Sequence, residues 1–356
     1  MESPQTEEPD LARPASPVQS RRAVLGIAAA AVAAPAALSL GIVVSRQGRG
    51  AERVRLLGHL SSLPLDDPLM NPRAGRLKTL FEELERNGWV VGRNLRYEVR
   101  SGAGGPAARA VAIQELIDLD PDVIITVSSS ETAALLAKTR TIPVLFATAA
   151  DPLGSGFVES LARPGGNATG YIAGEAEPGG KMLQFLQEAA PRLSRVGAFL
   201  NPRTSPRNGG YFLEPVERAG VALGVSVTPV SITDPSEIEA AVAAYAGGQD
   251  SGIVVLIDSF LVTHRRALVD AVTRYRVPAI YPYNYFMEVG GLMSYGPSLE
   301  VRVGEYVNLI SRGAKPAELP VQSPRRYELL INRKAAQALG LILPLTLLAR
   351  ADRIIE

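Results

Sequence analysis

The sequence predicts an α/β protein built from two similar, doubly wound lobes. Two strand–helix–strand patterns carry this prediction, at residues 121–147 and 251–281. In the first pattern a β-branched run at 123–127 meets three serines, a helical pattern begins at Glu131, and Pro143 precedes a second apolar run. Strands that are joined by such a crossover helix pair in parallel within one sheet.

The chain also resembles itself over most of its length. Residues 53–60 resemble 195–202, and residues 94–100 resemble 225–231, at offsets of about 130 to 140 residues. Solenoid repeats have much shorter periods of about 20–50 residues. The long, degenerate repeat therefore favours two similar lobes in tandem, with a cleft between them.

In the first lobe, strands and helices are expected to alternate ahead of the 121–147 unit. We expect a strand over 53–60, a helix over about 74–87, a strand over 95–99 and a helix over about 107–119. The first helix has apolar residues at i, i+3, i+4 and i+7, which is one helical face. A short helix after Asp151 and a turn at 164–170 are interpreted as the first crossing between the lobes.

The second lobe is expected to follow the same order. Its predicted elements are a helix over about 180–190, a strand over 196–200, a helix over about 209–223, a strand over 225–230 and the 251–281 unit. Later elements fit neither repeat and are interpreted as crossings that tie the lobes into a hinge. We assign 53–169 plus about 290–320 to the first lobe, and 170–289 plus about 321–356 to the second.

The composition is ordinary for a soluble two-domain protein, with 356 residues, 46% apolar and 21% charged. A net charge of +1 gives no electrostatic case for a nucleic acid or an anionic membrane as partner. Cysteine is absent, which excludes disulfides, thiolate metal sites, thiol catalysis and a lipidated cysteine.

Residues 1–52 are expected to be a disordered N-terminus followed by an export signal or anchor. Arg21 and Arg22 precede an uncharged run over 23–44, which is similar to a twin-arginine export signal. The 22 residues of this run could also span a bilayer as an uncleaved anchor. In both cases the folded part lies outside the cytoplasm.

Polar side chains follow predicted strands at the sheet edge where ligands bind in open α/β sheets. Ser128, Ser129 and Ser130, with Thr132, offer hydroxyls and helix N-terminal amides that suit a carboxylate. The same serines are also good helix caps. Asp258 follows an apolar run in the second lobe and is expected either to pair with a ligand ammonium or to cap the next helix.

Tyrosines are concentrated at 281–295, although aromatic residues make up only 6% of the chain. Their rings could form a cleft wall that stacks on a flat or apolar ligand. Phe286 is expected in the core. Tyr285 is expected either in the core or at the cleft. Ser61 and Asn201 follow the first strand of each lobe at matching positions, as ligand contacts or as ordinary turn residues.

The expected ligand-binding residues form one set at the inter-lobe edge. They are Ser61, Ser128, Ser129, Ser130, Thr132, Thr148, Asp151, Asn201, Asp258, Tyr281, Tyr283 and Tyr295. Asp151 precedes a proline and is more typical of a turn. No catalytic residue, metal site or cofactor is expected. His59 and His264 lack a metal-ligand companion at useful spacing and are expected to be structural, and motifs for a nucleophile elbow or a phosphate loop are missing.

Four stretches carry a resemblance to a known family. They read ADPLGSGFVESLARPGGNATG, IYPYNYFMEVGGLMSYG, GAKPAELPVQ and YELLINRKAAQALGLILP. Together they resemble bacterial ABC-transporter substrate-binding proteins, in the branch similar to tryptophan/tyrosine-uptake binding proteins of the type I periplasmic-binding fold. The resemblance covers about 53–356. It implies two Rossmann-like lobes that a hinge closes on a small ligand, and a partner permease with its ATPase.

The expected function is therefore that of an extracytoplasmic solute-binding component of an ABC importer. Its ligand is expected to be an amino acid or a related carboxylate or amide, and no enzymatic activity is expected. Two alternatives stay open because fold does not fix function. One is a ligand-sensing receptor module, and the other is an exported α/β hydrolase that uses Asp151 or Asp258.

Overall fold

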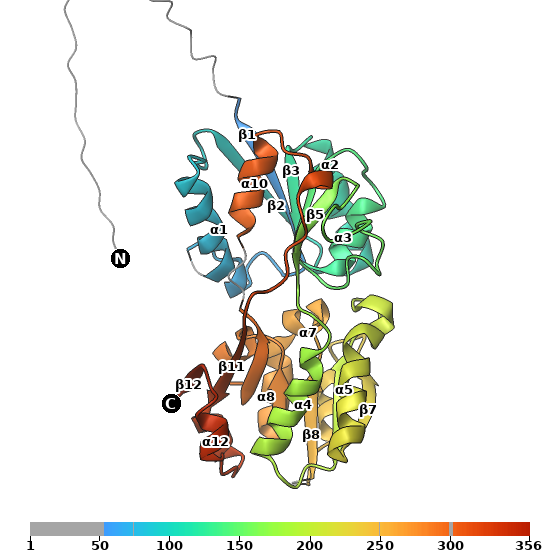
Figure 1. Ribbon diagram of the computed structural model, residues 1–356, viewed down its shortest axis with the longest axis vertical. Helices are drawn as coiled ribbons and strands as arrows, with labels where there is room; N and C mark the ends of the chain where they lie inside the picture. Colours follow the sequence, from blue (N-terminus) through green and yellow to red (C-terminus); the bar gives the residue numbers. More distant parts are fainter. Residues whose placement is uncertain (1–52, 74, 249, 299–301) are drawn as a thin grey trace, which may run out of the picture. The chain divides into compact units, whose positions relative to one another are not determined.

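The computed structural model describes residues 53–73, 75–248, 250–298 and 302–356. The disordered N-terminus, export signal and anchor expected over 1–52 lie outside the described residues. The described part falls within one compact unit. It contains two α/β lobes, each built on a sheet of its own (Figure 1).

The sheet of the first lobe has five parallel strands in the order β2-β1-β3-β4-β5. The strands are β1 (Arg55–Ser61), β2 (Leu95–Ser101), β3 (Val123–Thr126), β4 (Val144–Ala149) and β5 (Ala168–Ile172). The helices of this lobe are η1 (Pro68–Met70), α1 (Gly75–Arg86), α2 (Pro106–Asp118), α3 (Ser129–Leu136) and α10 (Val303–Ser311). One apolar core joins α1 and α10 to the sheet, and a second core joins α2 and α3 to it.

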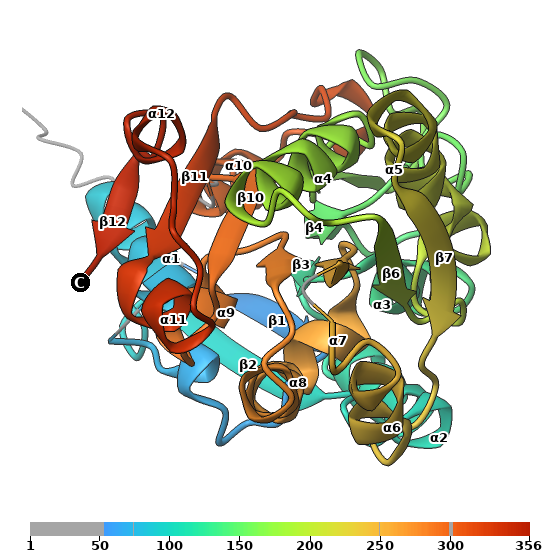
Figure 2. The same ribbon diagram turned by 90° about the horizontal axis from the view of Figure 1, so that it is seen from below.

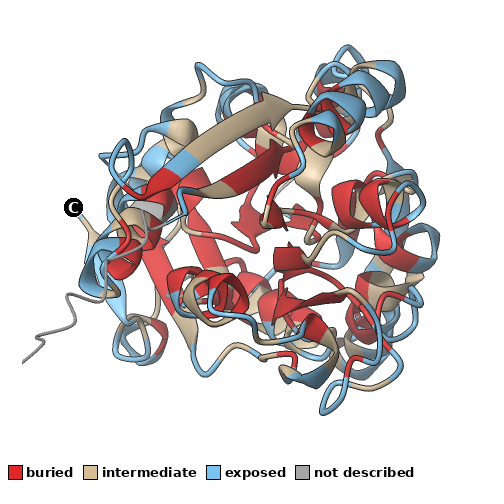
Figure 3. Ribbon diagram, turned by 90° about the horizontal axis from the view of Figure 1, so that it is seen from above, coloured by how far each residue is buried: buried red, intermediate tan, exposed pale blue. Residues whose placement is uncertain are grey.

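The sheet of the second lobe has seven strands in the order β12-β11-β10-β9-β8-β6-β7. The strands are β6 (Arg195–Leu200), β7 (Ser226–Ser231), β8 (Ser251–Val255), β9 (Ala279–Tyr281), β10 (Met293–Pro297), β11 (Tyr327–Asn332) and β12 (Arg353–Ile355). Among the strand pairs of the described residues, only that of β10 with β11 is antiparallel. The strands in the middle of both sheets consist mainly of buried residues (Figure 3).

Helices cover both faces of the second sheet (Figure 2). The helices of this lobe are α4 (Pro178–Ala189), η2 (Pro206–Gly209), α5 (Gly210–Leu223), α6 (Glu237–Ala243), α7 (Ser259–Thr263), α8 (Arg265–Arg274), α9 (Tyr285–Glu288), α11 (Arg333–Ala338) and α12 (Leu345–Leu348). A further short helix, η3 (Pro316–Glu318), lies beside β5 of the first lobe. One core contains side chains of α4 and α5, and the other contains side chains of α6 and α8.

The predicted fold class and the predicted repeat are confirmed by the strand order. In each lobe the second strand in sequence lies outermost, and the first, third, fourth and fifth follow it. This order is the one found in flavodoxin-like doubly wound sheets. The second lobe extends the pattern with β11 and β12, which have no counterpart in the first sheet.

Two details of the expected lobe boundaries are wrong. Residues from about 290 were expected in the first lobe, but β10 is hydrogen-bonded between β9 and β11 in the second sheet. The first crossing was expected at the 164–170 turn, but 168–172 forms β5. Gly170 interrupts the apolar pattern of this strand, so the alternation that identifies a strand is not visible in the sequence. Asp151 begins a series of turns and no helix.

The chain passes between the lobes after β5, between β10 and α10, and between η3 and β11. Two of these passages lie side by side, because Gln322 forms an isolated parallel bridge with Tyr171. The Gln322 N–H donates to the carbonyl of Gly170 at 2.8 Å, and the N–H of Ile172 donates to the carbonyl of Gln322 at 2.9 Å. The edge of the first sheet is thereby tied to the segment that enters the second.

Gly170 should be the least replaceable residue at this junction. Its φ is 151°, and a Cβ atom there would lie 1.9 Å from the carbonyl oxygen of Phe146 in β4. We expect Gly170→Ala to lower the free energy of unfolding by about 2–4 kcal/mol, because strain and overpacking add. Gly166→Ala is the matched control, since nothing lies within 4 Å of a Cβ built there. Equal denaturant midpoints for the two variants would contradict the close approach of β4 and β5.

Candidate functional site

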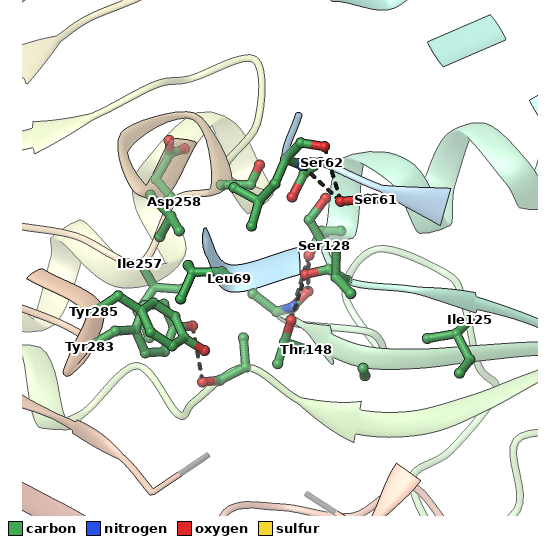
Figure 4. A pocket seen from close by; sticks show the side chains of 18 of the residues that line it. Ser61, Ser62, Leu69, Ile125, Ser128, Thr148, Ile257, Asp258, Tyr283 and Tyr285 are labelled. Carbon is green, nitrogen blue, oxygen red and sulfur yellow. Dashed lines mark hydrogen bonds between the residues drawn. The ribbon is translucent and has the colours of Figure 1, made fainter. Parts of the chain in front are cut away.

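A cavity of about 1090 Å³, counted with the open space at its mouth, lies between the strand ends of the two lobes. The first lobe contributes residues of β1, β3 and β4 and of the turns that follow them. The second lobe contributes residues that follow β6, β8 and β9. Of the residues expected to bind ligand, six line it: Ser61, Ser128, Ser129, Thr148, Asp258 and Tyr283. Figure 4 shows Asp258 and Tyr283 on one side and Ser61, Ser128 and Thr148 on the other.

Ser128 is the N-cap of α3, as the capping interpretation predicted. Its Oγ accepts a hydrogen bond from the N–H of Glu131 at 3.3 Å and donates one to the carboxylate of Glu131. The two residues have the spacing of a capping box, but the Glu131 carboxylate accepts from the hydroxyl of Ser128 and not from its backbone N–H. Glu131 is buried, and burial raises the pKa of its carboxyl group to about 7, against the opposing effects of Ser128 and Arg109.

Ser129, Thr148 and Ser61 bond to backbone groups at the same edge. Ser129 Oγ accepts from the N–H of Ala150 at 2.8 Å, and Thr148 Oγ1 donates to the carbonyl of Val127 at 2.5 Å. Ser61 Oγ accepts from the N–H of Leu63 at 3.0 Å. These hydroxyls hold the turns that follow β1, β3 and β4 in place, and they line the cavity at the same time.

Asp258 has the capping role that the sequence left open, and it also lines the cavity. It caps α7 by accepting from the N–H of Leu261 at 2.9 Å. Its other oxygen accepts from the hydroxyls of Thr204 at 2.6 Å and Ser205 at 2.8 Å. Burial raises the pKa of Asp258, and the hydrogen bonds from Thr204, Leu261 and Ser205 oppose that shift.

The aromatic wall differs from the expected one. Tyr283 lines the cavity together with Tyr285, and their ring centroids are 5.6 Å apart. Tyr281 is wrong as a ligand contact, because it is fully buried and stacks on Phe286 at 4.8 Å in the core of the second lobe. Tyr295 is wrong as well, since it packs edge-on against Phe185 and lines a separate, smaller cavity. The core position expected for Phe286 is confirmed.

Four other expected contacts lie outside the wall of the described cavity: Ser130, Thr132, Asp151 and Asn201. Thr132 is buried and bonds through its hydroxyl to the carbonyl of Ser128 at 2.7 Å, so it belongs to the helix start. Ser130 lies 3.0 Å from the hydroxyl of Ser128. Asn201 accepts from the N–H of Arg203 at 2.9 Å, which is ordinary turn chemistry.

Two ion pairs join the lobes near the cavity. Asp151 pairs with Arg207 of η2 at 2.9 Å, and the side chain of Arg207 is 55% exposed. Asp67, in the loop after β1, binds Arg265 of α8 through two contacts of 2.8 and 2.9 Å. The side chains of this second pair are only 11% and 8% exposed.

His59 also lines the cavity, although a structural role was expected for it. It is buried on β1, and its Nδ1 lies 2.5 Å from the hydroxyl of Tyr97. A signal was present, because His59 precedes Ser61 by two residues and so faces the same side of a strand. Other wall residues, among them Thr204, follow no recognisable motif in the sequence.

The described ranges contain neither a candidate metal site nor a candidate membrane span. No group of three or more His, Cys, Asp or Glu residues is placed there to hold a metal ion. None of the helices that the structure describes is long and apolar enough to cross a membrane.

Two α/β lobes with a lined cavity between their strand ends define a two-lobed ligand-binding protein. The chain matches the family described as ABC transporter substrate binding protein over residues 71–355. Because the match covers most of the chain, the protein belongs to this family, and the expected family resemblance is confirmed.

The individual proteins that resemble this chain have low sequence identity to it, between 22% and 24%. A tyrosine-binding protein of Clostridioides difficile (strain R20291) is 23% identical over 271 residues, which are 74% of this chain and 76% of the relative. A conserved domain protein from Vibrio cholerae has a TM-score of 0.76 at 24% identity, covering 85% of this chain and 100% of its own. The ABC domain from Streptococcus pneumonia in complex with L-Trp has a TM-score of 0.73 at 22% identity, covering 85% and 99%. At these identities the structural likeness shows a shared fold.

Glu131 makes the stability of this edge depend on pH. The raised pKa, about 7 against an ordinary 4.5, means that the folded state binds this proton more tightly than the unfolded state does. The free energy of unfolding should therefore fall as pH rises from about 4.5 to about 7 and then level off. The side-chain oxygen of glutamine can still accept from the Ser128 hydroxyl, so we expect Glu131→Gln to be stabilising by about 2 kcal/mol more at pH 8 than at pH 5.

Denaturant titrations at the two pH values measure this difference. Glu85→Gln, at an exposed position of α1, is the control for loss of one negative charge. If Glu131→Gln and wild type change in parallel between pH 5 and pH 8, the carboxyl group of Glu131 does not titrate as its burial requires.

Proposed function

We propose that this chain is the extracytoplasmic solute-binding component of an ABC importer, and that it binds an amino acid or a related small carboxylate or amide between its lobes. One observation carries the proposal: a single cavity is lined by a buried carboxylate from the second lobe and by a hydroxyl-rich helix start from the first. These opposite chemistries suit the two charged ends of a zwitterion.

The ligand carboxylate is assigned to the start of α3. Helix N-termini favour anions because their first N–H groups are not used within the helix. Ser128 and Ser129 line the cavity there. The hydroxyl of Ser128 donates to Glu131 and that of Ser129 bonds to Ala150, so backbone N–H groups are the main donors unless these hydroxyls rotate.

The ligand ammonium is assigned to Asp258. A positive group beside this buried carboxylate would favour its ionised form and offset the effect of burial. The rings of Tyr283 and Tyr285 stand on the same side of the cavity (Figure 4). Relatives support an aromatic amino acid as ligand, since one is a tyrosine-binding protein and a similar structure holds L-Trp.

The hydrolase alternative has less support. It required Asp151 or Asp258 as the reacting carboxylate. Asp151 is paired with Arg207, and Asp258 accepts three hydrogen bonds while it caps α7. Both groups thus have structural partners, and membership of a substrate-binding family favours binding without turnover. The permease and ATPase that the family implies are the expected partners.

A thermal-shift screen of amino acids, followed by calorimetry, tests this function. A ligand at a hundred times its Kd should add about 2.7 kcal/mol to the stability of the folded state. We expect Asp258→Asn to weaken the best amino acid roughly 10- to 150-fold, because it removes one charge-assisted hydrogen bond. Asparagine still caps helices, so the variant should fold.

The matching 2-oxo acid is the control ligand, since it lacks the ammonium group and should bind wild type and Asp258→Asn alike. Asp270→Asn, at an exposed position of α8, is the control variant. If Asp258→Asn binds the amino acid as tightly as wild type does, Asp258 is a helix cap alone. If no amino acid or carboxylate stabilises the protein, the proposed ligand class is wrong.

The extracytoplasmic location has its own test. Arg21 and Arg22 lie outside the described residues, and we propose that they direct export through a twin-arginine pathway. We expect the replacement of both by lysine to leave the protein in the cytoplasm, as measured by cell fractionation. Replacement of Arg46 and Arg49, which follow the apolar run, should leave export unchanged. Normal export of the Arg21/Arg22 variant would rule out this route.

A further inference from the structure

The segment that follows β1 reaches from the first lobe to the second. It covers residues 62–70, and we call it the β1–η1 arm. Leu63, which is only 4% exposed, belongs to the second-lobe core that contains side chains of α6 and α8, and Leu69 and Met70 pack against the same core. Leu69 also lines the cavity, where Figure 4 shows it near Ile257. The arm therefore buries apolar surface of one lobe against the other.

The base of the β1–η1 arm is fixed to the first lobe. The N–H of Leu63 donates to the hydroxyl of Ser61 at 3.0 Å. The carbonyl of Leu63 accepts from the hydroxyl of Ser101, in the neighbouring strand β2, at 2.8 Å. Pro64 and Pro68 restrict the backbone of the arm even before the chain folds. The arm thus has a defined position on the first sheet, and we expect it to move with the first lobe.

The arm carries Asp67, which binds Arg265 of the second lobe. Asp67 is the N-cap of η1 and accepts from the N–H of Leu69 at 2.8 Å, with Pro68 at the first helical position. Its two carboxylate oxygens accept from the guanidinium of Arg265 at 2.8 and 2.9 Å. Arg265 also donates to the carbonyl of Val262 at 3.0 Å within its own lobe. Each charged group is thus oriented by its own lobe, and the planar fork of arginine matches both oxygens.

This ion pair is distant from the two chain passages that are bridged to each other. The edge strand β5 leads into one of these passages, and the bridge of Tyr171 with Gln322 joins it to the other. Strands β4 and β3 lie between β5 and β1, and three strand spacings amount to about 14 Å. A rotation about the bridged passages displaces a contact in proportion to its distance from them. Opening of the cavity by such a rotation therefore separates Asp67 from Arg265.

We propose that Asp67 and Arg265 form a latch, an interaction made only in the closed arrangement of the lobes, which sets the affinity for the ligand without contacting it. Neither side chain is part of the cavity wall described above. The apparent Kd depends on how the free protein divides between open and closed arrangements, so an interaction made only in the closed one tightens binding. The inference rests on the proposed function, because it concerns the affinity for an amino acid.

Calorimetry on the full chain tests the latch. The probe is the protein amino acid that binds wild type most tightly, with L-tyrosine and L-tryptophan measured first. We expect Asp67→Asn and Arg265→Met each to raise its Kd about 10- to 100-fold, because the closed arrangement loses a nearly buried ion pair. Asparagine can still accept from the N–H of Leu69. The double variant should bind no more weakly than the weaker single variant, since one shared interaction is lost only once.

Arg274→Met is the matched control, because it also removes a positive charge from α8. Arg274 pairs with Glu239 inside the second lobe, and both side chains are exposed. We expect this variant to keep the wild-type Kd within about twofold. Stopped-flow kinetics give a second readout: loss of the latch should act mainly on the dissociation rate, since the latch forms after the ligand has entered. A residue with a purely structural role would lower the free energy of unfolding and leave the Kd unchanged.

The outcomes separate this inference from the proposed function. If the Asp67 and Arg265 variants bind the amino acid as tightly as wild type does, the latch is wrong and the proposed function stands. Additive losses in the double variant, or an equal loss in Arg274→Met, would also overturn the latch, because the effect would not belong to the pair. If no amino acid binds wild type, both proposals fall. Should Arg265→Met not fold, Arg265→Lys decides: it keeps the charge and loses the fork, and a wild-type Kd in it overturns the inference.

Discussion

The parallel pairing of strands within each lobe is the constraint on which the site depends. A crossover helix returns the chain to the start of the next parallel strand, so the residues that follow every strand gather at one edge. Ser61 at the end of β1, Ser128 after β3 and Thr148 near the end of β4 come together in this way. Thr204 and Asp258 follow β6 and β8. The two edges enclose the cavity between them. Residues distant in sequence are thus brought to one site by backbone topology alone.

The strand ends that line the cavity are also helix starts that need caps. Ser128 caps α3 and Asp258 caps α7, and both line the cavity. A place in the cavity wall and a capping role are therefore compatible for one side chain here, because a carboxylate or hydroxyl oxygen has more than one lone pair. A consequence is that truncation of either residue would change stability and affinity together. Only substitutions that keep the cap can separate the two effects.

The sequence was sufficient for the fold of the two lobes and for the edge at which the cavity lies, because local periodicity and strand–helix boundaries determine both. It was insufficient for side-chain faces that depend on neighbouring strands. Tyr281 and Tyr283 lie two residues apart and both belong to the core of the second lobe, yet only Tyr283 also lines the cavity, because β9 ends at Tyr281 and regular alternation stops there. Part of the cavity wall was not predictable for a related reason. This wall includes Val303 of α10, which returns to the first lobe from a distant part of the chain.

The contacts that hold the lobes together differ in their energetics. In the pair of Asp151 with Arg207 the arginine side chain is exposed to solvent. Exposed ion pairs contribute about 0–1 kcal/mol to the free energy of unfolding. The pair of Asp67 with Arg265 is nearly buried and has two contacts. Asp67 also accepts a hydrogen bond from the N–H of Leu69, and Arg265 donates one to the carbonyl of Val262. Each side chain would thus keep one partner within its own lobe if the pair separated. Because the pair is nearly buried, its separation still costs more than that of an exposed pair, and any movement that parts the lobes must break it.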